Sequence, residues 1–355
     1  MTASSIDSKF AEMRQDCLAA CEGQADVRAG LARQHIAVTG GTGFLGSWIA
    51  EMVAALNDQY QLGITLDLFA RNVSEWPAQY PHLAGRADIR LRSQDVRSPF
   101  EFAKNTSFVI HAAGIPNNRV HASDPLRVHQ TTVAGIGNAL DAASQLDGLR
   151  RFVNISSSLV AGTPQRPGPL GENDYYPIPS GQLHKVYVDA KRSAEMLASI
   201  YRSQYRLPVS TLRPFTLTGA YQQLDRPWAI NNFLRDVLTG SEIRIHGDGS
   251  ARRSYLYGSD AAWWTLAALV KGVDGEVYNL GSAQAVTHLE LVRMIGERVS
   301  PAPRVALNTA PGKQPVQDDL YPDVAATEKR LGVRQTCNLE QTIAKTYRWF
   351  AAPRA

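Results

Sequence analysis

Apolar and polar positions change their spacing repeatedly between residues 35 and 216. Short apolar runs, which suit buried parallel strands, alternate with longer segments whose apolar residues recur every three or four positions, as in helices that cover a sheet. This alternation predicts an α/β fold built on a doubly wound parallel sheet. The expected strands span residues 36–38, 63–70, 89–91, 107–111, 152–155 and 209–212, and the expected helices span residues 44–56, 128–143 and 186–201.

The spacing changes after about Thr216, where short helical segments, glycine turns and a proline-rich stretch over residues 301–322 replace the regular alternation. We therefore expect a main domain over residues 35–216 and a smaller domain over residues 217–350. The smaller domain would lie at the carboxyl ends of the strands, where ligands bind in such sheets. A further strand near residues 276–282 is expected to return to the main sheet.

Residues 1–34 precede the first expected strand. Phe10, Met13, Cys17 and Cys21 recur there at helical spacing, which predicts an added amphipathic helix. Its apolar side would dock on the body of the protein or on a partner subunit. A metal site at the two cysteines is the weaker interpretation, because no nearby His or Cys would complete it.

The segment 35–49, which reads HIAVTGGTGFLGSWI, joins an expected strand to an expected helix through a glycine-rich turn. Gly40, Gly43 and Gly46 would let the chain turn sharply and pack closely. Free backbone N–H groups and the positive end of the helix dipole attract an anion at such a turn. We interpret the turn as the pyrophosphate site of a dinucleotide. A glycine turn without a ligand is the alternative, which the strand before and the helix after disfavour.

Three side chains suggest hydride-transfer chemistry beside such a dinucleotide. Tyr187 and Lys191, in the run YVDAK, stand four residues apart on an expected helix and so face the same way, and Ser157 follows a different strand. Tyrosine is a poor base at its free pKa of about 10. A lysine ammonium and an oxidised nicotinamide would both lower that pKa, and Ser157 would hydrogen-bond the substrate oxygen.

Composition limits the class of protein. The chain has 355 residues, of which 44% are hydrophobic and 20% charged, as is ordinary for a globular protein. A formal net charge of +4 is too mild to indicate a nucleic-acid partner. Three cysteines without a CxxC pair argue for a reducing compartment. No apolar run is long enough to span a membrane, and no signal peptide is evident. We expect a cytoplasmic protein with neither a membrane partner nor a metal.

Seven motifs occur in a characteristic order, namely TGGTGFLG, HAAG, SSSLVAG, YVDAK, LRPF, GDGSARRSYLYGSD and VYNLGS. Through them the chain resembles the extended short-chain dehydrogenase/reductase family, and within it the NAD-dependent nucleotide-sugar epimerases and dehydratases. The resemblance covers about residues 35–350. It implies a Rossmann-type nucleotide-binding domain, a smaller C-terminal substrate-binding domain and a nucleotide-sugar substrate. It also implies a homodimer formed through the helices that carry residues 131–143 and 187–203.

The resemblance further implies a role for individual residues. Tyr187 would be the proton-transfer base, Lys191 would bind the nicotinamide ribose and lower the tyrosine pKa, and Ser157 would complete the catalytic set. The implied cofactor-binding residues are Gly40, Gly43, Phe44, Leu45, Gly46, Arg71, Asp95, Val96, Ala112, Ala113, Gly114, Tyr187, Lys191 and Pro214. The implied substrate-binding residues are Ser158, Thr216, Asn232 and Arg253, the last of which would hold the diphosphate.

Departures from the family pattern narrow the reaction. Ser158 and Leu159 stand where dehydratases carry an acidic pair and where decarboxylases often carry a glutamate. Neither residue can transfer a proton as a carboxylate does. We therefore expect an epimerase or oxidoreductase that acts at a ring hydroxyl, at C4. The alternatives are an NADPH-dependent keto-sugar reductase, a dehydratase that uses another group such as His184, and a catalytically inactive cofactor-sensing protein.

The choice between NAD and NADP depends on the end of the second strand. Asp67 is spaced suitably to bind ribose hydroxyls, but three apolar residues continue the strand beyond it, so that Arg71 stands at the strand end. An arginine there could accept a 2′-phosphate or stack on adenine. We expect NAD, because a redox-neutral epimerase keeps one cofactor bound, and we retain NADP as the alternative.

Overall fold

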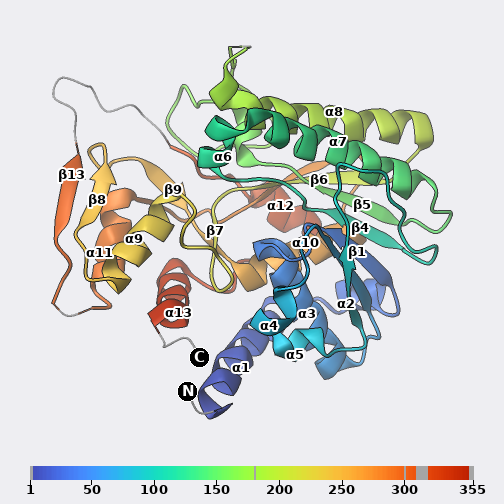
Figure 1. The fold of residues 1–355 in the computed structure, drawn as a ribbon, viewed down its shortest axis with the longest axis horizontal. Helices are drawn as coiled ribbons and strands as arrows, with labels where there is room; N and C mark the ends of the chain where they lie inside the picture. Colours follow the sequence, from blue (N-terminus) through green and yellow to red (C-terminus); the bar gives the residue numbers. More distant parts are fainter. Residues whose placement is uncertain (1–2, 180, 300, 309–318, 352–355) are drawn as a thin grey trace.

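The computed structural model describes residues 3–179, 181–299, 301–308 and 319–351. At its centre lies a seven-stranded sheet in which every neighbouring pair of strands is parallel (Figure 1). The order β3-β2-β1-β4-β5-β6-β11 is that of a doubly wound sheet, as the sequence predicts. The strands are β1 (His35–Thr39), β2 (Thr65–Ala70), β3 (Ile89–Ser93), β4 (Phe108–His111), β5 (Arg151–Ile155), β6 (Val209–Pro214) and β11 (Val277–Leu280).

Helices cover both faces of this sheet (Figure 1). On one face, α7 (Pro125–Ser144) and α8 (Val186–Tyr205) pack against each other, with α6 (Asn118–Ser123) at their end. On the other face, α3 (Phe44–Tyr60) packs on α10 (Gly258–Lys271), with α12 (Ala325–Leu331) beside it. Two apolar cores result, one on each side, which explains why β1, β4 and most of β5 are buried on both faces. The short helices α4 (Trp76–Gln79) and α5 (Pro81–Ala84) follow β2.

A smaller cluster of elements stands beside the main sheet and has its own apolar core (Figure 1). Three helices form its body, namely α9 (Ala229–Leu238), α11 (His288–Gly296) and α13 (Leu339–Ala351). Two short strand pairs accompany them, namely β8 (Ile243–His246) with β13 (Val305–Asn308) and β9 (Arg252–Ser254) with β12 (Ala285–Thr287). A third pair, β7 (Leu217–Thr218) with β10 (Leu256–Tyr257), packs on α10 and shares the core of the main layer. The strand β11 lies between these elements in sequence, yet it pairs with β6 of the main sheet.

The chain before β1 forms two helices rather than the single helix that the sequence predicts. A turn that contains Gly23, whose φ is +77°, separates α1 (Ala3–Ala20) from α2 (Ala25–Leu31). Helix α1 packs on α3 and α10 and buries Met13 and Cys17, while Phe10 is partly buried. Cys21, in the turn just after α1, is buried in the same core. No helix in the described part of the chain is both long and apolar enough to cross a membrane.

Candidate active site

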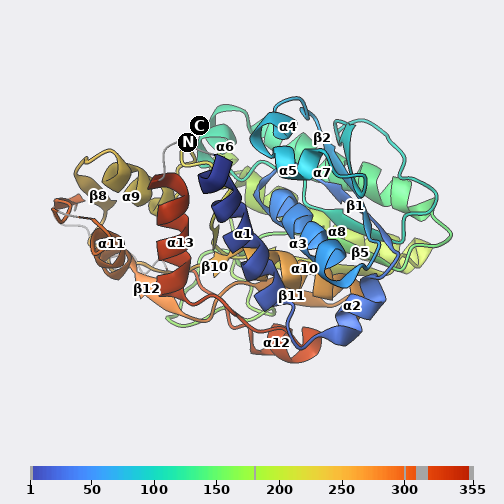
Figure 2. The ribbon, with the colours of Figure 1, turned by 90° about the horizontal axis from the view of Figure 1, so that it is seen from below.

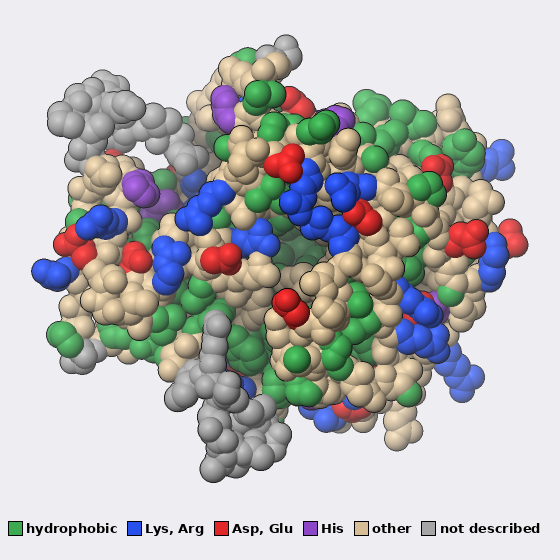
Figure 3. All heavy atoms as spheres, viewed as in Figure 1, with side chains coloured by type: hydrophobic (Ala, Val, Ile, Leu, Met, Phe, Trp, Pro, Cys, Tyr) green, Lys and Arg blue, Asp and Glu red, His purple; other side chains and the backbone are tan. Residues whose placement is uncertain are grey.

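A cavity of about 1750 Å³ lies at the carboxyl ends of the main-sheet strands and is also lined by residues of the smaller cluster. The surface is hollowed near the middle of the face drawn in Figure 3, and Lys and Arg side chains gather along the upper edge of that hollow. A cavity of this size, bounded by strand ends and a second group of elements, is large enough for a dinucleotide together with a second ligand.

The glycine turn forms one wall of this cavity, and its geometry fits a bound pyrophosphate. Gly40 has φ of +71°, and a Cβ there would lie 2.8 Å from the backbone of Ala112. A Cβ on Gly46 would lie 2.3 Å from the carbonyl oxygen of Gly41, so only glycine lets α3 begin this close to the turn. The start of α3, where an anion binds in such folds, therefore lies at the cavity wall, which Gly43, Phe44, Leu45 and Gly46 line.

Most of the predicted cofactor-binding residues line the same cavity. They are Gly40, Gly43, Phe44, Leu45, Gly46, Arg71, Val96, Ala112, Ala113, Gly114, Tyr187, Lys191 and Pro214. Asp67 is buried within β2, where its carboxylate lies 3.3 Å from His35 and 3.4 Å from Arg92. Arg71, just after the end of β2, is thus the charged side chain at that strand end.

Asp95 does not line the cavity, and its role in binding the cofactor stays a prediction. Its carboxylate accepts hydrogen bonds from the guanidinium of Arg97, at 2.6–3.1 Å, and from the Arg97 backbone N–H. The lining at the end of β3 comes instead from its neighbours, Gln94 and Val96.

Ser157, Tyr187 and Lys191 come together on the cavity wall. Ser157 follows the end of β5, and the other two lie in the first turns of α8, so the sheet and the helix fix their positions. All three are buried, with exposed fractions of 8%, 7% and 4%. The Lys191 ammonium donates a hydrogen bond of 2.7 Å to the carbonyl of Ile155, and it lies 5.9 Å from the centre of the Tyr187 ring.

Burial dominates the electrostatics of this trio. It raises the pKa of Tyr187 to about 12, although a hydrogen bond with Ser157 acts in the opposite direction. It also lowers the pKa of Lys191 to about 8, against the effect of Glu195. The lower tyrosine pKa that the sequence predicts is therefore not found for the chain alone, because desolvation outweighs the stabilising contacts.

The predicted substrate-binding residues divide into two groups. Ser158, Thr216 and Arg253 line the cavity, and so does Leu159. Asn232 does not line it, although its neighbours Trp228, Ala229 and Ile230 do, and its side-chain oxygen accepts a hydrogen bond from Arg235. Its role in substrate binding stays a prediction. His184 is exposed and lies outside the lining, so it is not placed to replace the missing carboxylates.

Sequence reasoning missed His121, which lies in α6. Its ring stacks on the Tyr187 ring, with the centroids 4.6 Å apart and the planes inclined by 13°. Its Nε2 lies 2.6 Å from the carbonyl oxygen of Ile115, and burial lowers its pKa. No local pattern in the sequence could have linked this histidine to the tyrosine, since the two meet only through the packing of α6 against the start of α8.

No metal centre accompanies these side chains in the part of the chain that the structure describes, where no three His, Cys, Asp or Glu residues gather as metal ligands.

Residues 36–281 match the model of the NAD dependent epimerase/dehydratase family. The chain belongs to this family. The NAD-dependent epimerase/dehydratase family is one of enzymes, and its cofactor is the NAD that the sequence predicts.

Relatives of this epimerase/dehydratase chain act on nucleotide sugars, according to their names. UDP-glucuronic acid decarboxylase 1 of Danio rerio is 25% identical over 322 residues, which is 90% of this chain and 73% of the relative. UDP-N-acetyl-alpha-D-glucosaminuronate decarboxylase of Bacillus cytotoxicus is 26% identical over 325 residues, which is 90% of this chain and 98% of the relative.

Solved structures share the fold. UDP-glucuronic acid 4-epimerase of Bacillus cereus, crystallised with UDP-glucuronic acid and NAD, superposes with a TM-score of 0.75 at 22% identity. The match covers 89% of this chain and 98% of that one. A dTDP-glucose 4,6-dehydratase of Streptomyces venezuelae gives a TM-score of 0.73 at 21% identity, covering 89% of this chain and 96% of that one.

Proposed function

We propose that this family member is a nucleotide-sugar epimerase that works by reversible oxidation of a ring hydroxyl, at C4. The observation that carries the proposal is the make-up of one cavity wall. Ser157, Tyr187 and Lys191 supply the groups for proton transfer at a hydroxyl, whereas Ser158 and Leu159 occupy the wall where elimination or decarboxylation chemistry would need a carboxylate. Oxidation and reduction at one carbon need no further acid or base.

Each of the three side chains has a distinct task. Tyr187 takes the proton of the C4 hydroxyl and later returns it to the same oxygen. Ser157 donates a hydrogen bond to that oxygen and keeps it against the phenol. Lys191, held by the Ile155 carbonyl, keeps a positive charge beside the tyrosine and faces the space where the nicotinamide ribose would lie. When NAD⁺ is bound, it supplies a hydride acceptor and a positive charge that favours the phenolate.

The other contacts follow from the lining of the cavity. The glycine turn and the start of α3 would hold the dinucleotide pyrophosphate, and Arg253 is the guanidinium that we assign to the substrate diphosphate. We further propose a homodimer through α7 and α8, whose surface exposes Leu126, Met196 and Tyr205 with exposed fractions of 66%, 62% and 58%.

A keto-sugar reductase that uses NADPH is the second candidate. The observation that favours it is Arg71, because a guanidinium at the end of β2 suits a 2′-phosphate. Such an enzyme would use the same trio in one direction only. Tighter binding of NADPH than of NADH, abolished by Arg71→Ala, would support it.

The test is to incubate the protein with UDP-glucuronic acid, UDP-glucose and UDP-N-acetylglucosamine in turn and to follow the products by mass spectrometry and NMR. An epimer of unchanged mass supports the proposal. Loss of water or carbon dioxide would contradict it and would point to the dehydratase or decarboxylase chemistry of the relatives. Mass spectrometry of the denatured protein would also show whether NAD copurifies, as a self-contained epimerase requires.

Tyr187→Phe is the matched variant, because it removes only the phenolic oxygen. We expect turnover to fall about 100- to 1000-fold, in the range that general acid–base catalysis contributes, while the protein still binds NADH. Turnover that is unaffected by this change would exclude the proposed role of Tyr187. Absence of any turnover in both proteins, with all three substrates, would favour the cofactor-sensing alternative.

A further inference from the structure

Helix α1 precedes the sheet, yet it contributes to the cavity. Lys9 and Phe10, in its first half, line the same cavity as the glycine turn and Tyr187. Trp349 and Phe350, near the end of α13, line it too. The two ends of the chain therefore form one wall of the ligand space together, and Figure 2 shows α1 and α13 side by side with their outer ends close to each other.

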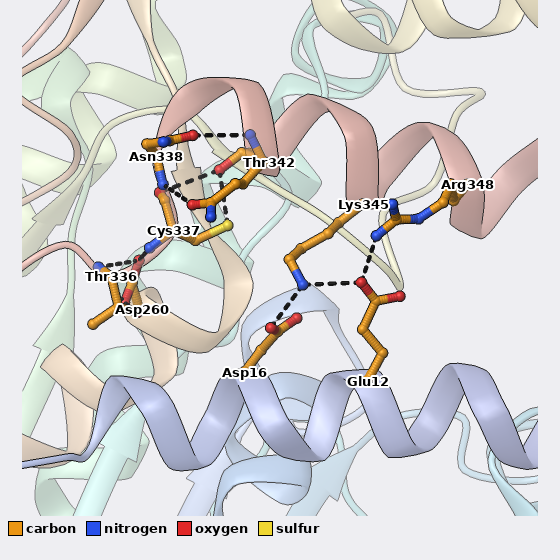
Figure 4. A network of polar contacts seen from close by, with 10 residues as sticks. Glu12, Asp16, Asp260, Thr336, Cys337, Asn338, Thr342, Lys345 and Arg348 are labelled. Carbon is orange, nitrogen blue, oxygen red and sulfur yellow. Dashed lines mark hydrogen bonds and ion pairs between the residues drawn. The ribbon is translucent and has the colours of Figure 1, made fainter. Parts of the chain in front are cut away.

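Long side chains connect the two helices (Figure 4). The Lys345 ammonium lies 2.9 Å from the carboxylate of Glu12 and 2.8 Å from that of Asp16. The Arg348 guanidinium lies 2.5 Å from Glu12. Lys345 and Asp16 are largely buried, with side-chain exposed fractions of 18% and 14%, so solvent screens this pair less than a surface pair.

Aromatic contacts extend this connection to the cavity wall. Lys9 donates a hydrogen bond of 3.3 Å to the Trp349 carbonyl, and the Trp349 ring lies 6.0 Å from that of Phe10. Tyr221 also lines the cavity here. Its ring centre is 5.4 Å from that of Trp349 and 4.6 Å from that of Tyr80. We call the contacts of Glu12 and Asp16 with Lys345 and Arg348, together with those of Lys9 and Phe10 with Trp349, the terminal clasp.

The terminal clasp joins the two parts of the molecule. Helix α1 is anchored to the main sheet layer, since Met13 and Cys17 share a core with α3 and α10. Helix α13 is anchored to the smaller cluster, since Leu339 and Ile343 share a core with α9 and α11. For these two parts to separate at the clasp, its ion pairs have to break.

We propose that the terminal clasp holds the two parts closed at this wall of the cavity and thereby slows the release of the dinucleotide. The inference rests on the proposed function, because a redox-neutral epimerase keeps its cofactor through many turnovers. It assigns to residues 9–20 a role in retaining the cofactor. The chemical step itself does not depend on that role.

The experiment measures the release of NADH from the full chain. The protein is loaded with NADH and chased with excess NAD⁺, and the loss of energy transfer from tryptophan to NADH gives the rate. Lys345→Met removes the shared cation at similar side-chain length, and Glu12→Gln is a milder change that leaves the Asp16–Lys345 pair in place. Lys271→Met is the matched control, because Lys271 pairs with Asp26 of α2 at 2.7 Å and neither residue lines the cavity.

We expect release to be about 10-fold faster in Lys345→Met, which loses its contacts with both Glu12 and the largely buried Asp16. We expect it to be about 3-fold faster in Glu12→Gln, which only weakens the more exposed contacts of Glu12 with Lys345 and Arg348, and unchanged in Lys271→Met. Hydrogen exchange at the amides of α13 reports independently whether the clasp has opened. Faster exchange in α13 with an unchanged release rate would overturn the inference, since the clasp would then be purely structural. An equal increase in release in Lys271→Met would overturn it as well. Failure of the unaltered protein to bind NADH would instead overturn the proposed function, and this inference with it.

Discussion

Neighbours in sequence determine where the Tyr187 side chain lies, whereas its pKa and its contacts depend on the rest of the fold. Lys191 follows four positions later on α8, and helical spacing alone brings both to the cavity. The pKa of the tyrosine depends on burial, which raises it to about 12 in the chain alone. The stacked ring of His121 and the Ser157 hydroxyl come from other elements, and they decide how the phenol is held.

His121 yields a prediction at the residue scale. His121→Ala removes the stacked ring and should let the Tyr187 phenol leave its position, with kcat about 10-fold lower and KM little changed, as expected for losing an aromatic pair beside a catalytic group. His121→Phe keeps the stack but cannot titrate or hydrogen-bond, and it should retain most of kcat. Steady-state kinetics with the UDP-sugar that turns over provide the measurement. A Phe variant as impaired as the Ala variant would show that the ring nitrogen, rather than the stack, is what matters.

At the scale of elements, the connection from β1 through the glycine turn to α3 is the most constrained part of the fold. Helix propensity by itself favours Ala over Gly inside a helix by about 1 kcal/mol. Gly46 in α3 nevertheless has no space for a β-carbon, since one would meet the Gly41 carbonyl oxygen at 2.3 Å. Helix propensity therefore predicts that Gly46→Ala stabilises the protein, whereas packing predicts that it destabilises it.

Gly46→Ala should accordingly lower the free energy of unfolding by about 1–3 kcal/mol and weaken NADH binding at least about 10-fold, because the turn has to open to admit the methyl group. Gly137→Ala in α7 is the control, since a β-carbon there meets nothing within 4 Å and helix propensity should add up to about 1 kcal/mol. Denaturant unfolding and NADH titration measure both effects. The steric argument fails should Gly46→Ala prove as stable as the unaltered protein.

At the scale of the whole molecule, Asp260 joins the segment before α13 to the layer that covers the sheet. Its carboxylate, at the start of α10, accepts hydrogen bonds of 2.6–3.1 Å from Thr336 and from the backbone N–H of Cys337 (Figure 4). Burial raises the pKa of Asp260 from 3.8 to about 6 in spite of these donors. The folded protein therefore binds a proton at Asp260 more tightly than the unfolded chain does.

Stability linked to Asp260 should fall as the pH rises. Between about pH 4 and about pH 6 the folded state holds more protons than the unfolded state, so the unfolding free energy decreases with pH, by at most about 3 kcal/mol in total, and levels off above. Asp260→Asn carries no charge at either end of this range. The stability of the unaltered protein relative to this variant should therefore decline between about pH 4 and about pH 6 in urea unfolding and change little above about pH 7. A difference that stays constant over that range would contradict the assigned pKa.

The sequence by itself determined what depends on local spacing. The alternation of buried strands and amphipathic helices specified the doubly wound sheet, because each period fixes which face of an element is buried. The glycine turn could be recognised from the sequence because the close contacts that require Gly40 and Gly46 involve nearby residues and the end of one adjoining strand. The four-residue interval between Tyr187 and Lys191 placed both on one side of α8.

Only the tertiary structure decided which distant segments meet and where each side chain is engaged. Asp95 accepts hydrogen bonds from Arg97 and Asn232 accepts one from Arg235, and neither residue lines the cavity. His121 reaches Tyr187, and Phe10 reaches Trp349, across intervals that carry no periodic signal. The physical reason is that periodicity encodes the buried face of an element but not its partner, which the packing of whole layers selects.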